Sequence, residues 1–191
     1  MSTLKLPSAA DSDLDDTLAR SAHEQPEAFA VLYQRHIRKI YCYHLARTGN
    51  VADAQDLTSQ TFMAALTGIA GFRGAGSFVA WLMGIAHNKC ALFFRQRKPE
   101  VPLEAADDQL IPGMPTEQSV GERLKTEQLR RALNNLSPER AEAIALCLFG
   151  DLTSAEAGRV LGKSEAAVKM LVFRGLRDLR HQLAQGLEEL V

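Results

Sequence analysis

Basic side chains recur at helical spacing near the end of the chain. Lys169, Phe173 and Arg177 share one row of the expected helix, and Met170 and Arg174 share the next. The opposite face carries an apolar stripe of helical period, made of Val168, Leu171, Val172, Gly175, Leu176 and Leu179. A helix that is apolar behind and basic in front is typical of the recognition helix of a DNA-binding helix-turn-helix. The alternative is a solvated basic face on an ordinary helical hairpin.

The residues just before this helix indicate how it is positioned. Thr153 is the predicted N-cap of a preceding helix, and Glu156 stands three residues on as its capping-box partner. Gly162 and Lys163 form the expected turn, and Ser164 is the predicted cap of the basic helix. The pattern therefore predicts two helices joined by a short turn.

A second group of cations lies on an expected helix from residue 77 to about 98, which contains no acidic residue. These cations are Lys89, Arg95, Arg97 and Lys98. The helix follows a glycine-rich loop, 67–76, that contains Phe72 and Arg73. Bases can stack on exposed aromatic rings while cations follow the phosphates, so this arrangement favours single-stranded nucleic acid. For Trp81 we favour the alternative, which is packing in the core.

Two further helices are expected in the first half of the chain. One runs from Pro26 to about residue 47, and the other from about residue 52 to 66, each with a buried apolar stripe. The second of these shows a polar face made of Asp53, Asp56, Gln60 and Met63. Such a face is either solvated surface or a docking site for a basic partner helix.

The composition changes at Pro99, and no helical period continues through residues 99–121, which are rich in proline and acidic residues. We therefore predict an all-α protein with two small helical domains joined by an acidic flexible linker. The expected domains are a disordered tail over 1–12, a first domain over 13–98, the linker over 99–121 and a helix-turn-helix domain over 122–191.

The whole-chain numbers exclude several classes of protein. The net charge of −1 means that any nucleic-acid surface must be made by local segregation of charge. The three cysteines are far apart, and the histidines show no ligand spacing, so we expect neither a metal nor another cofactor. No catalytic cluster supports a nucleic-acid-modifying enzyme. Without a signal pattern or a membrane-length apolar run, the expected location is the cytoplasm.

The chain resembles bacterial RNA polymerase sigma factors of the sigma-70 family, in the compact extracytoplasmic-function group. In the first domain, the resemblance rests on the segments Ala28-Phe29, Leu32-Tyr33, Asp53-Ala54-Gln55-Asp56-Leu57, Gln60-Thr61-Phe62, Phe72-Arg73-Gly74, Trp81-Leu82 and Ile85-Ala86-His87-Asn88. In the second domain, it rests on Leu136-Ser137-Pro138-Glu139-Arg140, Leu152-Thr153, Ala167-Val168-Lys169 and Phe173-Arg174-Gly175-Leu176.

The resemblance implies a factor without catalytic activity that binds core RNA polymerase and promoter DNA. It implies that the polar face with Asp53, Asp56, Gln60 and Met63 docks on the clamp helices of the largest subunit, while the second domain meets the flap of the second-largest subunit. It implies that the −10 non-template strand is held by Phe72, Arg73, Trp81, His87, Asn88, Lys89, Arg95, Arg97 and Lys98. It assigns the −35 duplex to Lys163, Ser164, Lys169, Met170, Phe173, Arg174 and Arg177. Many relatives also bind an anti-sigma protein.

Some positions depart from the family pattern. Gln55 stands where glutamate is usual, which would weaken the polymerase contact slightly, and Gly158 belongs to a smaller pair than usual, so we expect looser packing there. The competing interpretation is an ordinary transcriptional regulator that binds an operator. Such a regulator would need neither the cationic helix nor the glycine-rich loop before it.

Overall fold

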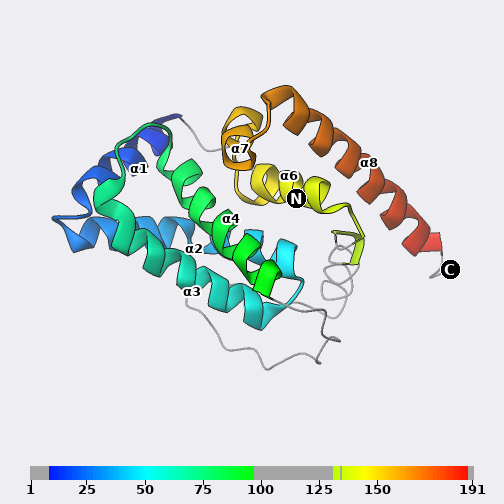
Figure 1. Cartoon of the computed structure of the whole chain (residues 1–191), viewed down its shortest axis with the longest axis horizontal. Coiled ribbons are helices and arrows are strands. Elements are labelled where there is room, and N and C mark those ends of the chain that lie inside the picture. The colour runs from blue at the N-terminus through cyan, green and yellow to red at the C-terminus, as the bar shows by residue number, and fades with distance from the viewer. Residues whose placement is uncertain (1–8, 97–130, 134, 189–191) are drawn as a thin grey trace.

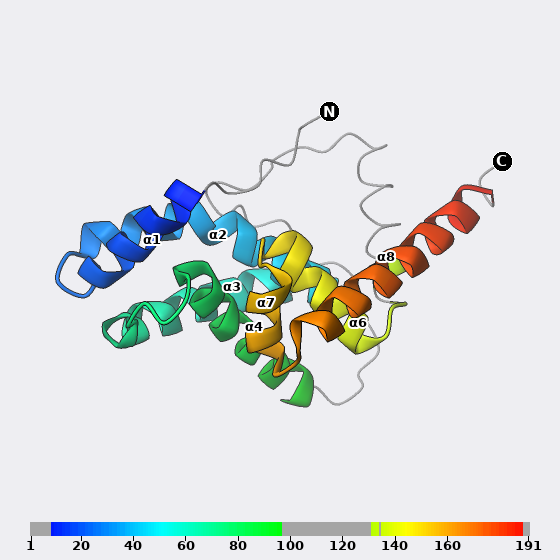
Figure 2. The same cartoon turned by 90° about the horizontal axis from the view of Figure 1, so that it is seen from above.

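The computed structural model describes residues 9–96, 131–133 and 135–188, and this part of the chain is helical with no strand. The elements are α1 (Ala9–Ser21), α2 (Pro26–Thr48), α3 (Val51–Gly68), η1 (Ile69–Gly71), α4 (Phe78–Gln96), α6 (Pro138–Ile144), η2 (Ala145–Phe149), α7 (Ser154–Leu161) and α8 (Glu165–Glu188). Figures 1 and 2 show α1 to α4 as one lobe and α6 to α8 as a second lobe beside it, with α8 projecting outward. The predicted all-α fold is confirmed.

The boundaries of α2 and α3 follow from their terminal residues. Pro26 occupies the first turn of α2, where a missing N–H costs nothing. Gly49 ends α2 in the left-handed region at φ 64°. The side chain of Asn50 then accepts a hydrogen bond from the backbone N–H of Asp53 and caps α3. The two helices therefore form a tight antiparallel pair (Figure 1).

Helix α1 holds the loop that precedes α4. The Asp16 carboxylate accepts a hydrogen bond of 2.6 Å from the backbone N–H of Phe78, the first residue of α4. The guanidinium of Arg20 lies over Gly74, which has a φ of 68°. Because α1 begins at Ala9, the predicted disordered tail over 1–12 is wrong for residues 9–12.

The second lobe contains the predicted helix-turn-helix. Thr153 and Glu156 form the capping box of α7, and the Ser164 hydroxyl accepts from the N–H of Ala167 at the start of α8. A Cβ added at Gly158 would lie only 2.6 Å from the backbone oxygen of Lys163. Glycine therefore allows close packing of the turn on α7, and the expectation of looser packing was wrong.

The apolar core is continuous between the lobes. Leu32, Phe78 and Met83 from the first lobe belong to the same buried cluster as Leu146 and Val168 from the second. The linker predicted over 99–121 lies outside the described residues, and the exact domain boundaries stay a prediction. In this conformation the two lobes pack as one body.

Some apolar helix residues are exposed, and one of them, Leu176, was assigned to the apolar stripe of the basic helix. Leu176 on α8 is 41% exposed and Leu92 on α4 is 40% exposed. Gly175 is buried as expected, and it lies so close to α6 that a side chain there would meet Ile144. The buried face of α8 that contacts α6 is thus narrower than the apolar stripe expected from its sequence. None of the described helices is both long and apolar enough to cross a membrane.

Candidate nucleic-acid interface

The aromatic residue of the glycine-rich loop lies inside the first lobe. Phe72 is 8% exposed, and its ring centroid lies 5.8 Å from that of Phe78 and 5.6 Å from that of Trp81. Arg73 beside it is exposed. The expectation of an exposed stacking ring at Phe72 is therefore wrong for this conformation, whereas the packing role that we favoured for Trp81 is confirmed.

The remaining candidates for single-strand binding lie along α4. Asn88 and Arg95 are exposed, and His87 and Lys89 are half-buried. At 1.5 Å per residue, the stretch from Trp81 to Arg95 is about 21 Å long, so these side chains form a track and not one pocket. Arg97 and Lys98 lie outside the described residues.

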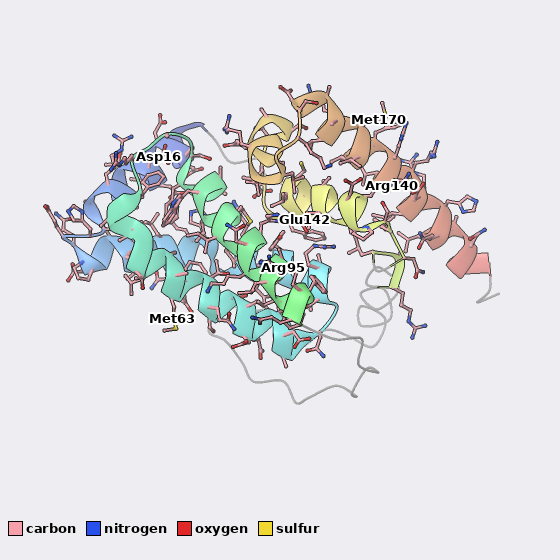
Figure 3. All side chains as sticks on the ribbon, viewed as in Figure 1. Asp16, Met63, Arg95, Arg140, Glu142 and Met170 are labelled. Atoms are coloured by element: carbon pink, nitrogen blue, oxygen red, sulfur yellow. The ribbon has the colours of Figure 1, made fainter. Side chains whose placement is uncertain are left out.

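His87 is occupied by a carboxylate from the second lobe. The Glu142 carboxylate of α6 accepts a hydrogen bond of 2.9 Å from His87 Nδ1 and one of 2.5 Å from the Tyr43 hydroxyl. Its other oxygen lies 2.7 Å from Arg47 Nε in an ion pair. Figure 3 shows Glu142 between the two lobes, facing α2 and α4. The side chains of Tyr43, Arg47 and His87 will be called the anion site.

The three side chains of the anion site keep the Glu142 carboxylate ionised. Burial alone raises the pKa of Glu142, but the His87 hydrogen bond, the Arg47 charge and the Tyr43 hydroxyl together bring it below its ordinary value of 4.5. Burial, with the negative charge of Glu142, raises the pKa of Tyr43. The carboxylate is therefore ionised and accepts from both the phenol and the imidazole.

Two more carboxylates of the second lobe contact the first lobe. Asp151 pairs with Lys39 of α2 at 2.9 Å, and Glu156 accepts a hydrogen bond of 2.6 Å from the Ser77 hydroxyl. Glu156 uses its second oxygen for the capping box of α7. The second lobe thus presents acidic groups to the first lobe at several points.

The outer face of α8 is open. Lys169, Met170, Phe173, Arg174 and Arg177 are exposed, and Phe173 is 65% exposed. Figure 3 shows Met170 pointing away from the lobe. Ser164 is also exposed, while Lys163 is half-buried and pairs with Glu139 of α6 at 2.8 Å. A basic helix with this much free surface fits the dimensions of a DNA major groove.

The polar face of α3 is also accessible. Asp56, Gln60 and Met63 are exposed and Asp53 is half-buried, with Met63 at 71% exposure. The Gln60 side chain donates a hydrogen bond of 2.7 Å to the Asp56 carboxylate. Figure 3 shows Met63 projecting from the face of the first lobe opposite the second. This surface therefore remains accessible to solvent when the lobes are packed together.

Sequence reasoning missed the contacts between the lobes. Tyr43, Arg47 and Glu142 were not singled out, because Tyr43 and Glu142 are 99 residues apart and neither belongs to a motif. One signal was available, since Glu142 stands between the apolar residues Ala141 and Ile144 on a helix face that must be buried.

Metal-binding groups do not cluster in the part of the chain that the structure describes. Cys42, Cys90 and Cys147 are free thiols. Burial raises the pKa of Cys90 to about 12, so this thiol is held in its protonated form. Cys90 belongs to the buried core cluster, and Cys147 packs against it.

Comparison with known families matches both lobes. The family model for Sigma-70 region 2 matches residues 32–100, and that for Sigma-70, region 4 matches residues 126–179. The ECF RNA polymerase sigma factor BldN of Streptomyces coelicolor is 36% identical, over 92% of this chain and 69% of the relative. The RNA polymerase sigma factor YlaC of Bacillus subtilis is 30% identical, over 83% of this chain and 93% of the relative.

Solved structures resemble the whole arrangement. The structure of CnrH in complex with the cytosolic domain of CnrY gives a TM-score of 0.70 at 25% identity, over 91% of this chain and 99% of that one. The sigma factor RpoE of Bartonella quintana, solved with the anti-sigma factor NepR, gives a TM-score of 0.66 at 20% identity, over 82% of this chain and 96% of that one. The second likeness concerns the fold alone.

Proposed function

The chain belongs to the sigma-70 family, in the extracytoplasmic-function group of RNA polymerase sigma factors, and from this premise we propose a division of promoter recognition between its lobes. It binds core RNA polymerase and directs promoter-specific initiation. The observation that carries the division is the presence of one exposed polar and cationic track on α4 and a separate basic face on α8. The first suits an opened strand and the second a duplex groove.

The first lobe binds the −10 element on the non-template strand. The exposed amide of Asn88 both donates and accepts hydrogen bonds, which suits the edge of a flipped base. Arg73, Lys89 and Arg95 hold phosphates, as do Arg97 and Lys98 beyond the described end of α4. Phe72 and Trp81 form the apolar floor beneath the loop. Phe72 would have to leave the core to stack on a base.

The second lobe binds the −35 element through α8. Arg174 and Arg177 are candidates for the bidentate contact with guanine, and Lys169 for a phosphate or a base edge. Met170 and Phe173 supply apolar contacts, such as those made with a thymine methyl group. Lys163 and Ser164 lie where the helix enters the groove and are assigned to the backbone.

The exposed face of α3 binds core polymerase. Asp53 and Asp56 supply charge for basic residues of the clamp helices, and Gln60 and Met63 supply the adjoining contact area. The second lobe meets the flap. An anti-sigma protein is a further partner, as the family resemblance implies, and the similar protein CnrH was itself solved with a protein partner, the cytosolic domain of CnrY. The factor itself is not an enzyme and acts in the cytoplasm at the nucleoid.

Reconstitution with sigma-free core polymerase tests this function. We expect promoter-specific transcripts from genomic fragments. Asn88→Ala should impair −10 selectivity and strand opening but leave duplex −35 binding intact. Arg174→Ala should relax −35 preference at one position, by about 1–3 kcal/mol. A chain that yields no specific transcript on any template would refute the function. Equal losses at both elements for each variant would refute the division.

A further inference from the structure

The packed lobes cannot read both promoter elements at once. By their positions, the −35 and −10 elements are about 85 Å apart along duplex DNA at 3.4 Å per base pair. A compact chain of this length has a radius of gyration of about 16 Å. The continuous core and the Glu142 contacts therefore belong to a closed conformation that must open before both elements are bound.

The anion site is assembled in the closed conformation around a group that is not nucleic acid. Tyr43 is fully buried, and Glu142 is 8% exposed. The Arg47 guanidinium also lies over the ring of Phe94, 5.6 Å from its centroid, which orients it toward α4. When the second lobe leaves, these donors remain on the first lobe with no carboxylate between them.

From this geometry we propose that the anion site binds a phosphate of the −10 single strand, and that Glu142 occupies it in the closed conformation as an internal competitor. The inference rests on the single-strand role proposed for α4. A carboxylate and a phosphodiester each offer two oxygens of similar separation. A guanidinium, an imidazole and a phenol are all suitable donors to either one.

The position of the site on α4 supports a phosphate as the occupant. His87 directly precedes Asn88 and Lys89, and Phe94 directly precedes Arg95. The anion site therefore adjoins the proposed strand track on the same helix, at its His87 end and again near Phe94. The same atoms cannot hold Glu142 and a phosphate together, so closure and strand binding exclude each other.

In two further polar contacts between the lobes, the second lobe again supplies the acidic group. Asp151 on Lys39 and Glu156 on Ser77 place acidic groups against the first lobe, as Glu142 does. A buried ion pair contributes little net stability once its desolvation is counted, so the main cost of separating the lobes is the exposure of their shared apolar core. Strand binding and polymerase binding supply the energy for release.

Single-strand binding by the full-length protein tests the proposal. The probe is a fluorescent −10 oligonucleotide, and the variants are Glu142→Gln, Arg47→Gln and their combination. If about one wild-type molecule in ten is open, Glu142→Gln should tighten binding by up to about tenfold. Arg47→Gln in the Glu142→Gln background should abolish this gain and lower the salt slope by about 0.7. Inorganic phosphate should compete only weakly, because it lacks the remaining strand contacts.

Glu139→Gln is the matched control, because it removes an exposed carboxylate from the same helix without touching the first lobe. Asp151→Asn is an independent opening variant. It removes the charge that faces Lys39, and asparagine tolerates the φ of 54° found there. It should raise strand affinity while leaving the anion site intact. A pair of fluorophores on the two lobes should report separation in both opening variants and not in Glu139→Gln.

The possible outcomes distinguish the competition by Glu142, the phosphate site and the proposed function from one another. Unchanged strand affinity and unchanged lobe distance in Glu142→Gln would overturn the competition. Opening without any dependence on Arg47 would overturn the phosphate site. If the holoenzyme itself fails to bind the −10 strand, the proposed function fails. If the holoenzyme binds it and Arg47→Gln has no effect, only this inference fails.

Discussion

Stability should fall as the pH drops from 7.5 to 5.5, because His44 is buried in its neutral form. His44 is fully buried in α2, and its Nε2 lies 3.0 Å from the Thr61 hydroxyl of α3. That hydroxyl donates to the Leu57 carbonyl at 2.7 Å, so its oxygen accepts the hydrogen bond from the Nε2–H of His44. His44 Nδ1 has no hydrogen-bond partner. A proton added at Nδ1 would bury an unpaired charge.

The magnitude follows from the difference in pKa between the folded and unfolded states. Burial lowers the pKa of His44 from 6.5 to about 3, and the nearby charge of Glu142 opposes this only in part. Between pH 3 and 6.5 the unfolded state binds more protons, so stability is complete above pH 6.5 and falls below it. Linkage gives a loss of about 1.4 kcal/mol between pH 7.5 and 5.5, and about 2.7 kcal/mol by pH 4.5.

Urea unfolding across this pH range measures the effect, with His44→Gln as the comparison. The variant is expected to be less stable at pH 7.5 but to lose about 1.4 kcal/mol less than the wild type on acidification to pH 5.5. His23→Gln, at an exposed histidine, should follow the wild-type slope. If the wild type and His44→Gln lose the same stability over this range, the assignment of a neutral, unpaired imidazole is refuted.

Two further predictions concern packing and polymerase binding. Gly158→Ala should lower the free energy of unfolding, because overpacking against the Lys163 carbonyl costs about 1–3 kcal/mol and exceeds the gain in helix propensity. Gly84→Ala in α4 meets no atom within 4 Å and should stabilise the protein by up to about 1 kcal/mol, so equal effects at both glycines would contradict the reasoning. Met63→Lys should change stability by less than about 0.5 kcal/mol yet weaken binding to core polymerase about tenfold in a titration. Unaltered affinity would remove α3 from the polymerase interface.

Local signals in the sequence were sufficient to predict where the helices lie and how several of them end. The capping box at Thr153 and the left-handed residue Gly49 were predictable, because each depends on residues within one turn of the chain. The exposed row on α8 followed from helical period alone. The same period wrongly predicted that Leu176 is buried. Because Gly175 lies close to α6, the side chain of Leu176 points outward and is exposed.

Contacts between distant segments were not predictable in this way. The burial of Phe72 depends on Phe78 and Trp81 filling the space beneath the loop, which residue types alone do not specify. The hydrogen bond between Tyr43 and Glu142 joins helices of different lobes that are far apart in the sequence. A lone glutamate beside apolar residues signals a buried partner without indicating which partner it is. The family resemblance supplied roles for individual lobes and no information about how the lobes meet.

The order of synthesis gives the anion site a brief period without its competitor. Tyr43, Arg47 and His87 are all translated before Glu142, which follows His87 by 55 residues. At about 5–20 residues per second, the ribosome needs about 3–11 s to add this stretch. During that time the donors of the anion site have no carboxylate from the second lobe to pair with. Under the proposed competition, closure therefore also ends a period in which the growing chain is exposed to other nucleic acids.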